Sequence, residues 1–188
     1  MKKLFTCVLL LTCFEWTARA QMSLSALESV SAVMDEVASV PLVWKVGDVS
    51  EFNVSAGTFG SGKMTKTVTQ DTGTAFWVLE NMSMPGHQEK LEKLYNKADG
   101  QIIKFIRNGT EQNPADSKID VESQNDDKVT VPAGTFNTLH IVGKTKNTSR
   151  IELWSNPDAT VIDGTIKLIM KSSFYTITSE LTGFKHAP

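Results

Sequence analysis

A glycine-rich stretch, residues 57–63, has a composition that could bind a phosphate group. It reads Gly-Thr-Phe-Gly-Ser-Gly-Lys and matches the first seven positions of a phosphate-binding loop. The eighth position of such loops is a Ser or Thr that holds magnesium, but here it is Met64. The alternating residues 65–69 predict a strand where the loop requires a helix. We therefore interpret the stretch as a glycine hairpin and expect no bound nucleotide.

The three histidines form no recognisable metal-binding pattern. His87, His140 and His186 are far apart in the sequence, and no two of them have the spacing of a ligand pair. His140 alternates with Leu139 and Ile141, so we expect its ring to face away from those side chains, toward water or a cavity. The sequence thus predicts no metal and no cofactor.

Catalytic motifs are missing from the sequence as well. It contains no Gly-x-Ser-x-Gly elbow, and no motif places a pair of carboxylates for acid–base work. Carboxylates on distant strands could still converge in the folded protein, an alternative that the sequence leaves open. We therefore predict a protein that is not an enzyme, and the sequence assigns no catalytic and no ligand-binding residue.

The first 20 residues have the pattern of a secretory signal peptide. Two lysines precede an apolar run from Leu4 to Phe14, and Ala18-Arg19-Ala20 forms a cleavage site of small residues. The apolar run is shorter than the roughly 20 residues that span a bilayer. Lipidation at Cys13 is the alternative, because Leu10-Leu11-Thr12-Cys13 is similar to a lipoprotein box. Thr12 is unusual before such a cysteine, so we predict cleavage after Ala20 and export to the periplasm or the medium.

Cysteine content and charge restrict the mature chain further. Both cysteines, Cys7 and Cys13, lie in the predicted signal peptide, so the mature chain has no disulfide and no thiolate ligand. The formal net charge of the full chain is −2, and the charges are scattered, which is not the basic pattern of a nucleic-acid-binding protein. No later stretch is apolar enough to cross a membrane, so we expect a protein that is soluble after cleavage. Its oligomeric state is not predicted.

One amphipathic helix is predicted near the N-terminus, between Ser23 and Val40. Its apolar residues recur at steps of three and four, Ser25 and Glu28 fit a capping box, and Pro41 ends the pattern. The predicted organisation is therefore a signal peptide (1–20), an N-terminal helix segment (21–42) and an antiparallel β domain (43–188). We expect the helix and the β domain to form one globular unit.

From Val43 onward the hydrophobic period changes to two, which predicts short strands. Alternating runs occur at residues 51–54, 63–68, 119–122, 128–131, 150–153 and 166–171, with turn signals between them. Gly100 and Gly109 have the positions of hairpin glycines. Residues 88–96 could form a charged helical turn, but the flanking turn signals favour a strand. The fold class is thus mainly β: a curved antiparallel sheet or open barrel with one helix packed on it.

Two predicted strands are apolar at successive positions, Phe76–Leu79 and Ile102–Ile106. Such strands are expected to be covered on both faces. The helix is the one other element with a matching apolar stripe. We therefore expect the stripe of this helix to pack against the concave face of the sheet, through Leu27, Val30, Met34 and Val37.

The stretch Val129–Phe136 reads Val-Thr-Val-Pro-Ala-Gly-Thr-Phe and is followed by Leu139-His140-Ile141. Together with the strand Thr165–Leu168 and the ending Leu-Thr-Gly-Phe at 181–184, it resembles a group of exported bacterial domains of unknown function. The resemblance implies a curved, open antiparallel barrel. In general build such a domain is similar to periplasmic carriers of the LolA type, in which a curved sheet and a helix hold acyl chains. We interpret the Pro-Ala-Gly corner itself as structural.

Two functions follow as hypotheses. The first is a binding module of the periplasm or cell envelope that shelters an apolar ligand, or a lipidated or peptide partner, in its curved sheet. The second is a non-catalytic structural or assembly protein of the envelope with a filled core. They differ in whether the concave side of the sheet leaves room for a ligand.

The signal-peptide pattern yields the first testable prediction. The intact mass of the protein from the cell envelope should match a chain that starts at Gln21, with or without cyclisation of that glutamine. A mass that corresponds to an acylated Cys13 would show instead that the protein is a lipoprotein.

Overall fold

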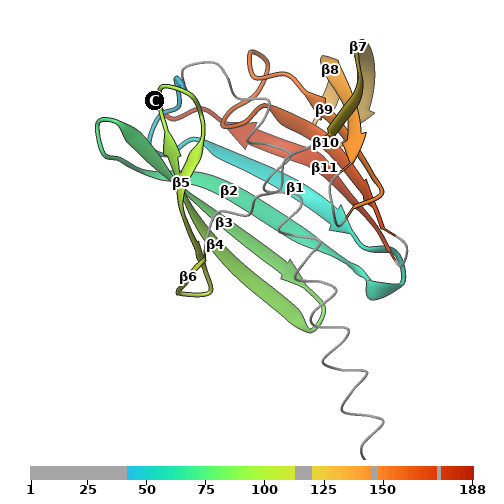
Figure 1. Ribbon diagram of the computed structural model, residues 1–188, viewed down its shortest axis with the longest axis horizontal. Coiled ribbons are helices and arrows are strands. Elements are labelled where there is room, and N and C mark those ends of the chain that lie inside the picture. The colour runs from blue at the N-terminus through green and yellow to red at the C-terminus, as the bar shows by residue number, and fades with distance from the viewer. Residues whose placement is uncertain (1–41, 113–119, 145–147, 173–174) are drawn as a thin grey trace, which may run out of the picture.

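The computed structural model describes residues 42–112, 120–144, 148–172 and 175–188 of the chain (Figure 1). The predicted signal peptide and the predicted helix between Ser23 and Val40 lie outside the described residues. The packing of that helix on the sheet therefore stays a prediction. Within the described residues no helix is both long and apolar enough to cross a membrane.

The described part of the chain is mainly β, as the sequence predicts, and forms one antiparallel sheet. Its strands are β1 (Val49–Ser55), β2 (Ser61–Asp71), β3 (Ala75–Met84), β4 (His87–Asn96), β5 (Ile102–Arg107), β6 (Thr110–Gln112), β7 (Asp120–Val131), β8 (Gly134–Lys144), β9 (Arg150–Ser155), β10 (Thr165–Lys171) and β11 (Thr176–Lys185), with one 3-10 turn, η1 (Gly57–Phe59). The strand order is β6-β5-β4-β3-β2-β1-β11-β10-β9-β8-β7. The sheet is not closed, because β6 and β7 are its two edges.

Local sequence signals explain most of the hairpins. The ambiguous residues 88–96 form a strand, β4, which confirms the prediction. Asn108 and Gly109 join β5 to β6 with φ angles of 48° and 83°, the positive values that a tight hairpin turn requires. Gly100 has a φ of 71° between β4 and β5, again as predicted.

The Pro-Ala-Gly corner joins β7 to β8. Strand β7 ends at Val131, and β8 begins at Gly134, whose φ of 141° would strain any other residue. The backbone N–H of Ala133 donates a hydrogen bond of 3.0 Å to the carbonyl oxygen of Leu181 on β11. Residues of β7 also approach β10, although β8 and β9 separate the two strands in the sheet. The β7 edge therefore bends back over the sheet.

A loop between β9 and β10, residues 156–164, bends toward the other half of the sheet. Its residues Val161 and Ile162 are buried against Val68, Phe76 and Tyr95 of β2, β3 and β4. Ile162 has a φ of 59°, which is strained for a β-branched side chain and persists here because its side chain is packed in that cluster. Contacts between such distant strands show that the sheet is curved, with this loop on its concave side.

We call the concave face, which carries Phe52, Lys66, Val78 and Leu91, the inner face. Cross-strand pairing places most of the buried apolar residues of β1 to β4 and of β9 to β11 on this same face, whereas Trp154 of β9 lies on the other face. Its largest fully buried apolar side chains are Phe52, Val68, Val78, Ile151, Leu153, Ile166, Leu168, Met170 and Leu181. The core therefore lies inside the curve of one sheet rather than between two sheets.

The expectation that two strands are covered on both faces is wrong for Ile102–Ile106. Ile103 is 55% exposed, whereas Phe105 on the same strand is buried. Lys104 pairs with Leu94 and Ile102 pairs with Tyr95, so Ile103 is the extra residue of a β-bulge and its side chain is left exposed. A single exposed apolar side chain is ordinary. In β3 the side chains of Phe76 and Val78 are buried, but those of Trp77 and Leu79 are only half-buried.

The glycine-rich stretch has a steric reason for one of its glycines. Gly62 directly precedes the first β2–β3 pair, Lys63 with Ser83. An added Cβ at Gly62 would overlap the backbone oxygen of Ser83 and lie 2.9 Å from Cα of Met84. We expect Gly62→Ala to lower the free energy of unfolding by at least about 1–3 kcal/mol, the usual cost of overpacking. Denaturant-induced unfolding measures it.

Gly183→Ala is the matched control, because Gly183 also lies in a strand but has room for a methyl group, with Oε2 of Glu51 at 3.8 Å. It should change the free energy of unfolding by less than about 1 kcal/mol. Equal effects of the two substitutions would contradict the close strand contact at Gly62.

Candidate functional site

Six charged side chains are buried on the inner face or beneath the loop that covers it. They are Lys66 on β2, Glu80 on β3, Glu89 and Lys93 on β4, Arg107 on β5 and Asp163 in the β9–β10 loop. Charged side chains are almost never fully buried unless they are paired. Three are cationic and three are anionic, so the group is balanced in formal charge.

The pairing of the strands brings these charges together. Glu80 lies opposite Leu91, and Lys93 is two residues farther along β4, so the two charged side chains are diagonal neighbours on one face. Nζ of Lys93 donates a hydrogen bond of 2.8 Å to Oε1 of Glu80. Glu89 and Arg107 are diagonal neighbours on β4 and β5 in the same way, and Arg107 forms an ion pair with Oε1 of Glu89.

Lys66 extends from β2 to the β9–β10 loop. Its ammonium group forms a hydrogen-bonded ion pair with Oδ2 of Asp163, and the two side chains are only 1% and 6% exposed. Burial alone raises the pKa of the Asp163 carboxyl, but the Lys66 charge and the hydrogen bonds from Lys66 and Thr165 outweigh it and hold this pKa below its ordinary value. The pair therefore fastens the loop to the inner face.

Glu89 has a different environment from Asp163. Burial raises the pKa of its carboxyl above the ordinary value, and the Arg107 guanidinium offsets this only in part. Within the described residues, its Oε2 atom is buried without a hydrogen-bond partner. Nε2 of His87 lies 4.0 Å from that atom.

A small cavity of about 20 Å³ lies beside Glu89 on the inner face. Its lining is almost entirely apolar apart from two carboxylates and one hydroxyl, and consists of Val54, Met64, Glu80, Met82, Glu89, Leu91, Ile177 and Ser179. The hydroxyl of Ser179 is also buried and has no hydrogen-bond partner in the described structure. Polar atoms of this kind can accept hydrogen bonds from a group that enters the cavity.

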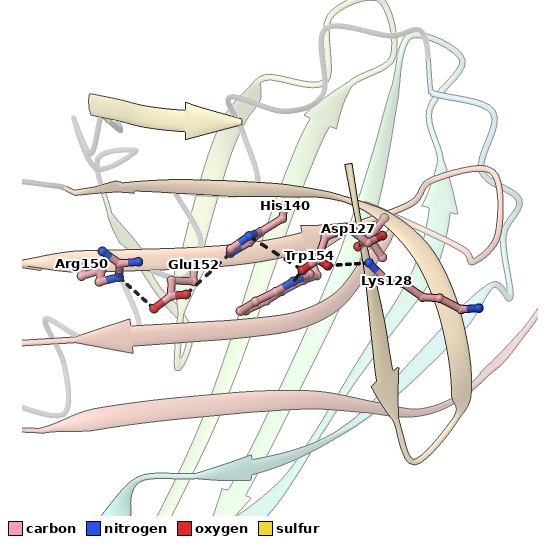
Figure 2. A network of polar contacts seen from close by, with 7 residues as sticks. Asp127, Lys128, His140, Arg150, Glu152 and Trp154 are labelled. Carbon is pink, nitrogen blue, oxygen red and sulfur yellow. Dashed lines mark hydrogen bonds and ion pairs between the residues drawn. The ribbon is translucent and has the colours of Figure 1, made fainter. Parts of the chain in front are cut away.

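A second polar network lies on the outer face, at the β7–β8–β9 end of the sheet (Figure 2). The rings of His140 and Trp154 stack with their centroids 4.1 Å apart, and Nε1 of Trp154 donates a hydrogen bond of 2.8 Å to Oδ2 of Asp127. The two ring nitrogens of His140 lie 3.9 Å from Oδ2 of Asp127 and 3.6 Å from Oε2 of Glu152. Oε1 of Glu152 accepts a 2.8 Å hydrogen bond from Nε of Arg150.

This outer network fixes the bent hairpin rather than forming a reactive centre. The hydrogen bond from Trp154 holds the pKa of Asp127 below its ordinary value, with help from the backbone N–H of Lys128. The six residues labelled in Figure 2 include no hydroxyl or thiol nucleophile. An open groove of about 610 Å³ runs beside the network, with Asp126, Asn137 and Asn156 in its lining. We therefore place the candidate site at the inner cavity.

The residues considered from the sequence are dispersed over the structure. Lys63 and Met64 lie in β2, as the strand prediction requires, and Met64 is a core residue. His140 faces away from Leu139 and Ile141 as predicted, but its ring is covered by Trp154 and its side chain is only 18% exposed. His87 begins β4, and His186 makes an edge contact with Phe184. Among the described residues, no group of three or more metal-ligating side chains is assembled.

Sequence analysis did not identify the buried charges, although a signal for them exists. In each strand they occupy the register of the apolar residues, as Lys66 does between Met64 and Val68, or Lys93 between Leu91 and Tyr95. The alternation of apolar residues is therefore interrupted by a charge on its buried side.

The sequence matches no family model and no curated protein. The resemblance of the Pro-Ala-Gly corner to exported domains thus stays a prediction, and function must be argued from the site.

The Lys66–Asp163 pair yields a stability prediction. Lys66→Met leaves the buried Asp163 carboxylate without its ammonium partner, so we expect the free energy of unfolding at pH 7 to fall by about 3–5 kcal/mol. The control is Lys104→Met, which removes an ion pair to Glu111 that is exposed on both sides and should cost no more than about 1 kcal/mol.

The sign of the pH dependence distinguishes this ion pair from a loss of packing. In the wild type, ionised Asp163 stabilises the fold above pH of about 4, and the contribution is lost as the pH falls through its lowered pKa. In Lys66→Met the charge and the hydrogen bond of Lys66 are lost, while burial and the hydrogen bonds from Thr165 remain, so the pKa of Asp163 is higher than in the wild type. Protonation of Asp163 then removes part of the destabilisation of the variant. The stability difference should therefore shrink between pH 7 and pH 4, and a constant difference would exclude an electrostatic origin.

Proposed function

We propose that this chain is a binding module of the cell envelope, which holds an apolar or amphiphilic ligand against the inner face of its curved sheet. The observation that supports this most directly is the cavity beside Glu89. Most of its lining is apolar, and the lining residues Glu89 and Ser179 each carry a buried oxygen, Oε2 and Oγ, that has no hydrogen-bond partner among the described residues. Sites for small molecules combine an apolar wall with a few polar groups in this way.

The shape of the sheet favours the same function. The β9–β10 loop reaches across to β2–β4, so the inner face is a trough rather than a flat surface. Export to the envelope rests on the signal-peptide pattern of residues 1–20. An exported trough lined by apolar side chains is suited to carry a molecule that water does not dissolve well.

The cavity volume determines how a ligand can enter. A space of about 20 Å³ holds roughly one water molecule, so a longer apolar chain requires that side chains lining the cavity move. Met64 and Met82 form part of the wall, and methionine adopts new rotamers more easily than branched residues do. The binding site would therefore enlarge as the ligand enters.

The alternative function is a structural or assembly protein with a filled core. The small volume of the same cavity favours it, as do the ion pairs that fasten neighbouring elements across the inner face. In that case the outer surface would carry the function, and no lipid-sized molecule would be bound.

Ligand content separates the two functions. We expect organic extraction of the purified protein to release an apolar or amphiphilic molecule near equimolar amount, detected by mass spectrometry. The extracted protein should then bind an apolar fluorescent dye. Met82→Trp fills the cavity and should weaken dye binding about tenfold or more. A tenfold weaker affinity corresponds to a loss of roughly 1.4 kcal/mol of binding free energy.

Asn81→Trp is the matched control, because it adds the same side chain one position earlier, on the exposed side of β3. Its dye affinity should equal that of the wild type, and both variants should be compared at temperatures where they remain folded. Absence of both an extracted molecule and dye binding in the wild type would favour the filled-core alternative.

A further inference from the structure

The lining of the inner-face cavity is mostly apolar but includes polar side chains. Two side chains in its lining, Glu89 and Ser179, are each only 4% exposed, and each carries an oxygen that is buried without a hydrogen-bond partner in the described structure. They come from β4 and β11, which four strand pairings separate in the sheet. The curvature of the sheet thus brings two side chains from distant strands, each with one such oxygen, to the lining of one small cavity.

Both atoms can accept a hydrogen bond. Oε1 of Glu89 is already engaged by Arg107, which leaves Oε2 as the open acceptor of a carboxylate. Oγ of Ser179 has two lone pairs and one hydrogen, so it can accept and also donate. A buried carboxylate oxygen that lacks a donor is unfavourable, and burial accordingly raises the pKa of Glu89. The group that best satisfies both atoms is a hydrogen-bond donor.

We propose that this cavity is a head-group subsite, which receives a single donor group, a hydroxyl or an ammonium, at the end of an apolar chain. The inference rests on the proposed function and specifies the class of ligand. The cavity volume of about 20 Å³ admits one group of the size of water and excludes a larger head group such as a phosphate or a sugar. The apolar chain attached to that group would contact Met64, Met82 and Ile177.

Three probes of equal chain length test the head-group preference. 1-Dodecanol and dodecylamine end in a donor, whereas methyl dodecanoate offers only acceptors. We expect the extracted protein to bind the alcohol and the amine at least about fivefold more tightly than the ester in dye displacement, as one hydrogen bond predicts. A larger preference for the amine would identify an ammonium ligand, and equal binding of the two donors would identify a neutral hydroxyl ligand.

Two variants locate the preference. Ser179→Ala should reduce the preference for the alcohol over the ester to less than about twofold, because it removes one acceptor and leaves every ion pair intact. Glu89→Gln should weaken dodecylamine about tenfold or more and dodecanol much less, because it removes the negative charge. Should Glu89→Gln fail to fold because Arg107 loses its partner, Ser179→Ala still decides the question.

Thr148→Val is the matched control. The hydroxyl of Thr148 is likewise buried without a partner in the described structure, but it does not line the cavity, so its loss should leave all three affinities unchanged. Equal affinity of wild-type protein for the alcohol, amine and ester would overturn the head-group subsite while leaving the binding function in place. Failure of all three probes to bind would overturn the proposed function as well.

Discussion

A buried charge is tolerable only when an opposite charge is buried beside it, and the inner face of this sheet depends on that constraint. Lys66, Lys93 and Arg107 lie in the register of core residues, where any of them alone would strongly destabilise the fold. Each has a carboxylate partner on a neighbouring strand or on the β9–β10 loop. Because an unpaired charge is so unfavourable, these pairs favour one register for β3–β5 and one position for the loop.

The Lys66–Asp163 pair connects this constraint to the shape of the molecule. The loop that carries Asp163 also places Val161 and Ile162 against the strands of the opposite half of the sheet. Its strained Ile162 backbone is held by that packing, so ion pair, loop conformation and core cluster support one another. At the other end of the inner core, the Pro-Ala-Gly corner bends β7 toward β11. The sheet can therefore remain open at its edges and still enclose a core.

Glu89 differs from the other buried carboxylates of the inner face in how its two oxygens are paired. Its partner Arg107 satisfies one carboxylate oxygen, while the other faces a cavity with an apolar lining. A residue selected for stability alone would gain from a second donor at that atom or from an apolar side chain in its place. Among the described residues neither this oxygen nor the neighbouring Ser179 hydroxyl has a partner, and we propose that a ligand supplies the missing donor. The outer network around His140 shows no such deficit on its carboxylates, since Asp127 and Glu152 are both hydrogen-bonded.

The sequence by itself determined the strands and the turns, because both depend on neighbouring residues. Period-two alternation gave most of the strands, and positive-φ glycines such as Gly109 and Gly134 marked their connections. The sequence did not reveal which charged residues form pairs. Lys66 and Asp163 are 97 residues apart, and no pattern in either segment predicts that they meet. Their pairing follows from the order of the strands and the curvature of the sheet. The exposed Ile103 was misjudged for the same reason, since only the pairing of β5 with β4 shows that this residue is the extra residue of a bulge.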